Sequence, residues 1–197
     1  METYPKQVDR RVERTRQLLL QASIAVMQEK GFATMSIHDI TDRANVNRGT
    51  FYAHFGDKYQ LLDVLIREEF YRFLKSHLPP NPQWDRKTLH VLIQTVLEYY
   101  SEMRRRCHLP LVNAATFERA IEEELTRLVL SWLQQGNNDR PPLQVPIETI
   151  AQVVCWAILG AAVKWSKETT SMSAEQMAND VLLVIMDGVM RLVPNIQ

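Results

Sequence analysis

The sequence predicts an all-α protein of about nine helices. Glycine accounts for only 6 of its 197 residues. No alternating run of Val, Ile and Thr is bounded by an Asn-Gly or Asp-Gly turn, the usual signal of a β-hairpin. Apolar residues recur instead with the 3.6-residue period of amphipathic helices. The length and an apolar fraction of 46% suffice for one good core or two modest domains.

A short helix is predicted to begin at Ser36. The Ser36 hydroxyl can accept a hydrogen bond from a first-turn amide, and Asp39, three residues later, can complete a variant of the capping box. Ile37, Ile40 and Ala44 then lie on one apolar stripe. These residues predict a short amphipathic helix that packs through that stripe.

A tight turn and a second short helix follow. Asn45 is among the few non-glycine residues that tolerate the left-handed conformation needed where one helix ends close to the start of the next. Asn47 is a good N-cap, and Phe51 and Phe55 are expected to point inward. Two short helices joined in this way indicate a DNA-binding helix-turn-helix.

Gly49 is unusual in the first turn of this second helix. Inside a helix, glycine costs about 1 kcal/mol relative to alanine. At an exposed first turn, however, it lets the backbone approach a partner closely. The outer face of the helix would carry Arg48, Thr50, Tyr52 and His54.

This stretch resembles the TetR family of bacterial repressors. The matching residues are Gly31-Phe32, Ser36-Ile37, Ile40, Val46, Gly49 to Tyr52, His54-Phe55, Lys58 and Leu61-Leu62. The resemblance covers about the first third of the chain. It places the family's first helix over residues 10–30, with an inward face of Leu18, Leu19, Ala22, Ala25 and Val26. It implies a DNA-binding domain over residues 1–57 and an effector-binding and dimerisation domain over residues 58–197.

Three residues depart from the family pattern. Thr41 replaces the usual alanine and Asn45 the usual turn glycine, which would shift the angle between the two helices slightly. Ala53 stands where many relatives carry an aromatic or polar side chain. One customary contact to DNA would therefore be missing.

The candidate DNA contacts lie on and around the second short helix. Arg48 is the best reader of bases, because a guanidinium pairs bidentately with guanine O6 and N7. Gly49 and Thr50 would approach base edges. The other candidates, which would contact phosphate, sugar or flanking backbone, are Ser36, His38, Asn47, Tyr52, His54 and Lys58. A basic stretch of Lys6, Arg10, Arg11, Arg14 and Arg16 would lie along phosphates or in a minor groove, or else form a solvated helix end.

Five more helices are expected after the helix-turn-helix. Proline and turn residues separate them, at Pro79-Pro80, Pro110 and the segment 136–142. The expected ranges are about 58–77, 82–106, 116–135, 146–167 and 173–192.

The last two of these helices are apolar around most of their circumference, which predicts a homodimer. One face can pack within its own domain, while another needs a second subunit. The alternative is a buried monomeric core. The predicted interface residues are Trp156, Gly160, Val163, Val181, Ile185 and Val189. The resemblance implies the same arrangement, a four-helix seam about a two-fold axis.

The middle of the chain offers an aromatic lining for a small apolar or aromatic effector. The candidates are Phe70, Phe73, Leu74, His77, Tyr99, Tyr100, Met103, Phe117, Trp132 and Trp156. The alternative is that these side chains close up as an ordinary core. In relatives of this kind, effector binding changes the relative placement of the two DNA-reading heads.

Several other classes of function are disfavoured. The sequence contains 23 basic and 23 acidic residues, so it lacks the broad positive field of a protein that coats nucleic acid. Cys107 and Cys155 lack disulfide or zinc spacing, and His77, His90 and His108 are too scattered for one metal site. No phosphate loop or nucleophile elbow appears. We expect no catalysis, metal or cofactor.

The expected function is that of a cytoplasmic, dimeric repressor that an effector releases from a palindromic DNA operator. The longest apolar stretch, from Val153 to Val163, is too short to span a bilayer. The alternative function keeps the fold but switches DNA binding, or turns it to activation, through a protein partner.

Overall fold

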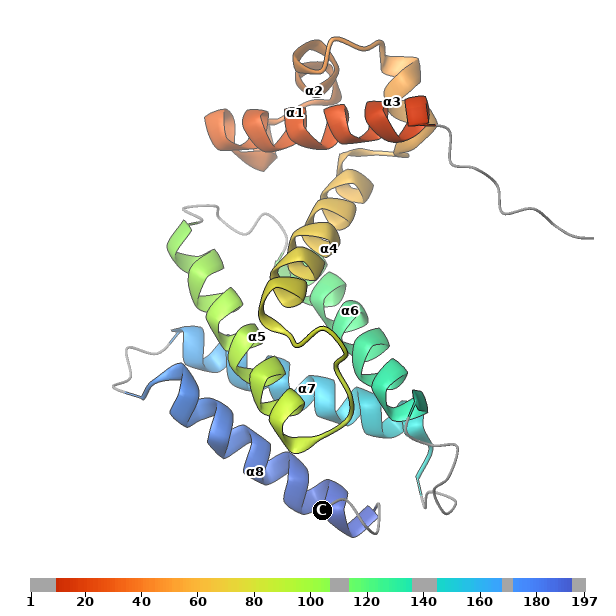
Figure 1. Cartoon of the computed structure of the whole chain (residues 1–197). Helices are drawn as coiled ribbons and strands as arrows, with labels where there is room; N and C mark the ends of the chain where they lie inside the picture. Colours follow the sequence, from red (N-terminus) through yellow and green to blue (C-terminus); the bar gives the residue numbers. More distant parts are fainter. Residues whose placement is uncertain (1–9, 107–113, 136–144, 168–171, 193–197) are drawn as a thin grey trace, which may run out of the picture. The chain divides into compact units, whose positions relative to one another are not determined.

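The computed structural model describes residues 10–106, 114–135, 145–167 and 172–192. These ranges contain eight α-helices and no strand (Figure 1), which confirms the predicted fold class. The helices are α1 Arg10–Thr34, α2 Ile37–Arg43, α3 Arg48–His54, α4 Lys58–His77, α5 Arg86–Arg106, α6 Ala114–Gln135, α7 Ile147–Lys167 and α8 Ala174–Leu192.

The chain divides into two compact units, Met1–Leu65 and Ile66–Gln197. The division falls inside α4, whereas the sequence suggested a division at its start. The first turns of α4 belong to the N-terminal unit because Leu61 is fully buried and Lys58 bonds to the backbone near the end of α1.

The N-terminal unit is built on α1, which is interrupted at Gly31, directly after the predicted end at Lys30. Gly31 adopts φ +77° and ψ 157°, and the helix resumes after it to Thr34. Leu19, Ala22 and Val26 are buried as predicted, but Leu18 is 41% exposed. Its expected place on the inward face is taken by Leu20, which is 2% exposed.

The C-terminal unit is built of helices that pack around α7. This helix packs against α5, α6 and α8. By length and composition alone α7 could cross a membrane, unlike the shorter stretch that the sequence suggested. Packing accounts for part of its apolar character, since Ile150, Val154, Ile158 and Ala162 are buried in the core. Burial also raises the pKa of the Cys155 thiol to about 11, which keeps it protonated; Cys107 lies outside the described residues.

Candidate nucleic-acid interface

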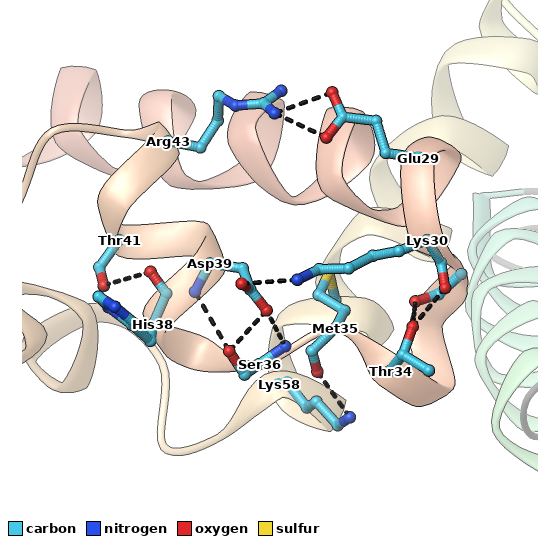
Figure 2. A network of polar contacts seen from close by, with 11 residues as sticks. Glu29, Lys30, Thr34, Met35, Ser36, His38, Asp39, Thr41, Arg43 and Lys58 are labelled. Carbon is cyan, nitrogen blue, oxygen red and sulfur yellow. Dashed lines mark hydrogen bonds and ion pairs between the residues drawn. The ribbon is translucent and has the colours of Figure 1, made fainter.

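The start of α2 is held by the predicted capping box. Ser36 Oγ accepts from the Asp39 amide at 3.2 Å, and Asp39 Oδ2 accepts from the Ser36 amide at 2.8 Å. Lys30 Nζ on α1 lies 2.6 Å from Asp39 Oδ1 (Figure 2). The hydrogen bonds from Lys30 and Ser36 hold the pKa of Asp39 well below its usual range. The Ser36 hydroxyl, a candidate for a DNA contact, is therefore already engaged in this cap.

A second ion pair joins α1 to α2. Arg43 Nη2 donates to both carboxylate oxygens of Glu29, at 2.8 and 2.7 Å. Figure 2 shows this pair and the Lys30–Asp39 pair, both between side chains of α1 and α2. Sequence reasoning missed both contacts, because neither pair follows the spacing of residues on a single helix.

The turn between α2 and α3 depends on Asn45, which has φ +53°. Its amide donates to Asp42 O at 3.1 Å, and the next amide, of Val46, donates to Thr41 O at 3.0 Å. Thr41 is 3% exposed, and its hydroxyl donates to His38 O at 3.0 Å. Both departures from the family pattern at this turn are accommodated, because Asn45 takes the left-handed conformation and the buried Thr41 hydroxyl has a partner.

The recognition helix α3 is fixed by its N-cap and two buried rings. Asn47 Oδ1 accepts from the Thr50 amide at 2.8 Å and from Thr50 Oγ1 at 3.1 Å. Phe51 and Phe55 are 0% and 2% exposed and face inward as predicted. A Cβ added at Gly49 would lie 3.1 Å from Asn47 Oδ1. Glycine at this position therefore protects the cap, in addition to any close approach to a partner.

The outward face of α3 presents Arg48, Gly49, Tyr52 and Ala53, all exposed. Arg48 Nη2 donates to Tyr52 Oη at 3.4 Å across one helical turn. Thr50 and His54 are half-buried beside this face, and His38 is exposed on α2. The planar guanidinium of Arg48 is thus displayed at the surface, with a neighbouring phenol that limits its orientations.

Lys58 is placed differently from the prediction, which made it a phosphate contact. Its ammonium donates to three backbone carbonyls, Met35 O at 2.9 Å, Phe32 O at 3.2 Å and Ala33 O at 3.3 Å. It also lies 4.9 Å from the centroid of the Phe32 ring. An ammonium has three donors, and all three are used. Lys58 therefore ties the start of α4 to the end of α1, where helix carbonyls lack helical partners.

The basic stretch at the N-terminus is only partly described. Arg10, Arg11 and Arg14 are exposed along the first turns of α1, and Arg16 forms an ion pair with Glu13 at 3.5 Å. Lys6 lies outside the described residues. Contacts from this stretch to a minor groove remain an expectation from the sequence.

Most of the predicted effector residues form closed core in the C-terminal unit. Five aromatic side chains are at most 6% exposed and belong to one core cluster: Phe70, Tyr99, Tyr100, Phe117 and Trp132. Phe73 and Met103 are half-buried, while His77 is exposed and lies against Phe73, with ring centroids 4.4 Å apart. Tyr99 lies against Phe70 and Tyr100 against Phe117, with ring centroids 5.0 and 5.4 Å apart, so the ordinary-core alternative describes these side chains better than an open aromatic pocket does.

Two cavities open elsewhere in this unit. One of about 920 Å³ lies between α4, the segment that follows it, and α6. Of the predicted effector residues, only Leu74 lines it. A second, of about 530 Å³, lies between α5, α6 and α7, and both Tyr100 and Trp156 line it. The sequence pattern did not identify either cavity, because cavities depend on how neighbouring helices meet.

The predicted dimer residues are only partly exposed. Trp156 is 59% exposed and Gly160 is exposed, while Val163 and Val181 are half-buried. Ile185 is 6% exposed and packs into the core, so it is a wrong choice for an interface residue. The side chain of Val189 lies outside the described residues. The other large apolar side chains exposed on these two helices are Val153 on α7 and Leu183 and Val184 on α8, at 58%, 53% and 74%.

Comparison with known proteins agrees with this geometry. Residues 19–65 match the family model described as bacterial regulatory proteins, tetR family. The chain is 46% identical over 63 residues to the uncharacterized HTH-type transcriptional regulator YxbF of Bacillus subtilis. The matched segment covers 32% of this chain and 17% of YxbF. It is 24% identical over 189 residues to the HTH-type transcriptional repressor KstR2 of Mycolicibacterium smegmatis, covering 87% and 88% of the two chains.

The solved structures show the same fold along nearly the whole chain. The structure of RolR in complex with resorcinol superposes with a TM-score of 0.58 at 17% identity, over 95% of this chain and 98% of RolR. The capped helix-turn-helix described above falls within the residues that match the family model. Residues 19–65 therefore match the TetR family of bacterial regulatory proteins, and the chain is similar over 87% of its length to an HTH-type transcriptional repressor.

Proposed function

We propose that the chain acts as a homodimeric repressor, released from a near-palindromic operator by a small apolar or aromatic effector in the cytoplasm. The observation that carries the proposal is the exposed face of α3, on which Arg48 is displayed from a helix that its N-cap and buried rings hold rigidly. The similarity to a transcriptional repressor over 87% of the chain supports repression.

In this proposal Arg48 reads a guanine in the major groove. Its guanidinium can donate bidentately to O6 and N7, and the bond to Tyr52 Oη restricts its rotamers before DNA arrives. Gly49 and the Thr50 methyl would approach neighbouring base edges. Tyr52, His54 and His38 would contact phosphate or sugar. Ser36 and Asn47 contribute chiefly by capping the two helices, since their side-chain oxygens already accept amide hydrogens.

Dimerisation follows from the geometry of operators and from exposed apolar surface. Helix-turn-helix proteins bind two half-sites about one DNA turn apart, so two recognition helices are needed. Trp156 and Val153 on α7 and Val184 on α8 are more than half exposed, which is unusual for large apolar side chains. A second copy of the chain would cover them in a four-helix seam.

Release of DNA by an effector depends on thermodynamic linkage between effector binding and DNA binding. A ligand that binds better to the conformation unable to grip DNA weakens DNA binding by the same factor by which DNA weakens ligand binding. The resorcinol in the RolR complex shows that a protein of this fold can hold a small hydroxylated aromatic molecule. The second candidate, a switch operated by a protein partner, is favoured by the same exposed apolar side chains if a different protein covers them.

Selection of genomic fragments tests the proposal. Purified full-length protein is incubated with sheared DNA of its source genome, and the retained fragments are sequenced. We expect enrichment of a near-palindromic motif beside a promoter, lost in an Arg48→Ala protein. Fragments without any shared motif would contradict sequence-specific binding. Co-purification of a second protein that is required for binding would favour the partner-operated switch.

A further inference from the structure

The outer face of α7 carries a large side chain and an open space one helical turn apart. Trp156 is 59% exposed. Gly160 follows four residues later on the same face, and a Cβ added to it would meet no atom within 4 Å. Exposed residues continue along this stripe in both directions, each three or four positions from the next: Thr149, Val153, Trp156, Gly160, Lys164 and Lys167. The stripe therefore presents a protruding ring beside an unfilled position.

The protruding ring is held in one orientation. Trp156 Nε1 donates to Glu122 Oε1 at 2.8 Å, and Gln152 Nε2 donates to the same oxygen at 2.6 Å. A side chain that is already ordered loses less conformational entropy when a partner binds it. Exposed tryptophans are also among the most frequent energetic anchors of protein interfaces. Trp156 thus has the properties of a preformed anchor.

The open space over Gly160 continues into the cavity between α5, α6 and α7. Leu159, Gly160 and Val163 contribute an apolar part of its lining. Trp156 of the same chain also lines it, so that this ring borders the cavity and does not fill it. The volume of about 530 Å³ lies in the range that accommodates drug-sized molecules. An indole ring from another chain therefore fits.

The ring and the open space complement each other only in a second copy turned end to end. In a two-fold interface, one residue contacts a second and the second contacts the first. If two α7 helices pack antiparallel about an axis between Trp156 and Gly160, each ring lies over the glycine of the other copy. The same arrangement brings the exposed Glu148 near Lys164 and Lys167 of the second copy. A parallel pair would bring the lysines of both copies together.

We propose that Trp156 of each copy inserts into the cavity of the other copy, over Gly160. The inference rests on the proposed function, in which a second copy covers the apolar surface of α7. It adds the pairing of residues and the direction of the helices. Each chain thus supplies the side chain that fills the space left open in its partner.

Two single variants remove the two halves of this contact. Trp156→Ala leaves both cavities empty, and Gly160→Leu fills both. Each change acts twice in a symmetric dimer, so each should weaken dimerisation of the full-length chain by about 100-fold or more in sedimentation equilibrium. The matched controls make the same kinds of change on α4: Tyr71→Ala removes a ring that is 58% exposed, and Lys75→Leu adds an exposed leucine. Both controls should dimerise as the parent does.

Loss of folding is excluded by the chemistry of the substitutions and by a melting curve. Leucine is a better helix former than glycine, and an added side chain at Gly160 meets no neighbour in its own chain. Trp156→Ala removes an exposed ring and leaves Glu122 its bond from Gln152. At concentrations where the parent is monomeric, both variants should therefore melt as cooperatively as the parent.

Recombining the two changes gives the decisive test. In the double variant Trp156→Ala/Gly160→Leu, each leucine occupies the space that the missing indole leaves, so dimerisation should recover by about tenfold or more relative to either single variant. In an equimolar mixture of the single variants, native mass spectrometry should show mixed dimers in excess of both homodimers. A mixed dimer pairs one indole with an open glycine and one alanine with a leucine.

The outcomes distinguish the pairing from the proposed function. A dimeric parent whose Gly160→Leu variant dimerises equally well would overturn the pairing, as would a face on which Trp156 meets its own copy. Absence of recovery in both the double variant and the mixture would also overturn it. In these cases the dimer itself stands. A parent chain that is monomeric both in solution and on the enriched operator would overturn the homodimer of the proposed function and leave this face to a different protein.

Discussion

At the scale of single residues, the same side chains that look like DNA contacts also hold the reading helices in place. Asn47 and Ser36 accept amide hydrogens in their own first turns. These caps were predictable from sequence, because both partners lie within three residues. The role of Lys58 was not, because its carbonyl partners precede it by 23 to 26 residues. A lysine near a DNA-binding helix has the same sequence signature whether it contacts phosphate or backbone.

The structure predicts that Lys58→Met destabilises the N-terminal unit. The variant keeps much of the aliphatic stem but leaves carbonyl oxygens of Phe32 and Met35 without their charged donor. We expect a loss of about 2 kcal/mol in the free energy of unfolding, the scale of hydrogen bonds to a charged group. Urea unfolding followed by circular dichroism measures it, with Lys75→Met, an exposed lysine of the same helix, as the control. Unchanged stability with uniformly weaker DNA binding would restore the phosphate role.

Arg48→Ala should relax sequence preference. Loss of a bidentate contact to guanine costs about 1–3 kcal/mol on the matched operator and little on a scrambled one. Tyr52→Phe should cost less, because it removes only the hydroxyl that orients the guanidinium. Fluorescence anisotropy on both duplexes at one salt concentration distinguishes the effects. Equal losses on the two duplexes would show that Arg48 contacts phosphate.

Asp39 gives the N-terminal unit a predictable response to acid. Its pKa lies well below the ordinary value of 3.8, because Lys30 and Ser36 donate hydrogen bonds to the charged form. Its contribution to stability is therefore complete above about pH 4 and is lost as the pH falls toward the lowered pKa. Asp39→Asn should lower the melting temperature at pH 7 and differ progressively less from the parent as the pH falls below 4. A difference that stayed constant with pH would mean that the carboxylate charge does not stabilise the fold.

At the scale of elements, helix identity was predictable and helix faces were less so. The bounds of α2 and α3 follow from local caps and a turn residue. The predicted inward face of α1 was only partly right, since Leu20 is buried in place of Leu18. Leu18, Leu19 and Leu20 are equally apolar, so only packing decides which of them are buried. In α8 the same ambiguity placed Ile185 on the wrong side. The closed aromatic core could not be distinguished from a pocket, because residue types do not reveal how neighbouring helices fit together.

The turn between α2 and α3 depends on a single left-handed residue. Asn45→Ala should destabilise the unit by about 1 kcal/mol, because a Cβ without a polar group to compensate is unfavourable at φ +53°. Asn45→Gly should be nearly neutral, since glycine adopts this conformation freely. Thermal unfolding compares the two. Equal effects of both variants would mean that the asparagine side chain, rather than the backbone conformation, holds the turn.

At the scale of the whole molecule, the chain consists of a DNA-reading unit and a helical unit with large apolar side chains exposed on α7 and α8. The sequence predicted both units, because one carries a specific motif and the other an excess of apolar helix surface. The residues available to the proposed interface depend on exposure, which only the fold reveals. Val153, Trp156, Leu183 and Val184 are the positions that a second copy would cover.

We propose that two copies of the chain, joined through α7 and α8, bind one operator. Sedimentation of the protein with the enriched palindromic duplex measures how many chains bind each duplex. The measurement is made with the parent chain and with the Val184→Glu variant. Val184 is 74% exposed, so the substitution should leave the fold of the monomer intact. The control is Tyr71→Glu on α4, which should leave the dimer intact. Two copies of the 22.9 kDa parent chain are expected on each duplex, whereas Val184→Glu should be monomeric and fail to bind stably. One parent chain per duplex, or full binding by monomeric Val184→Glu, would contradict it.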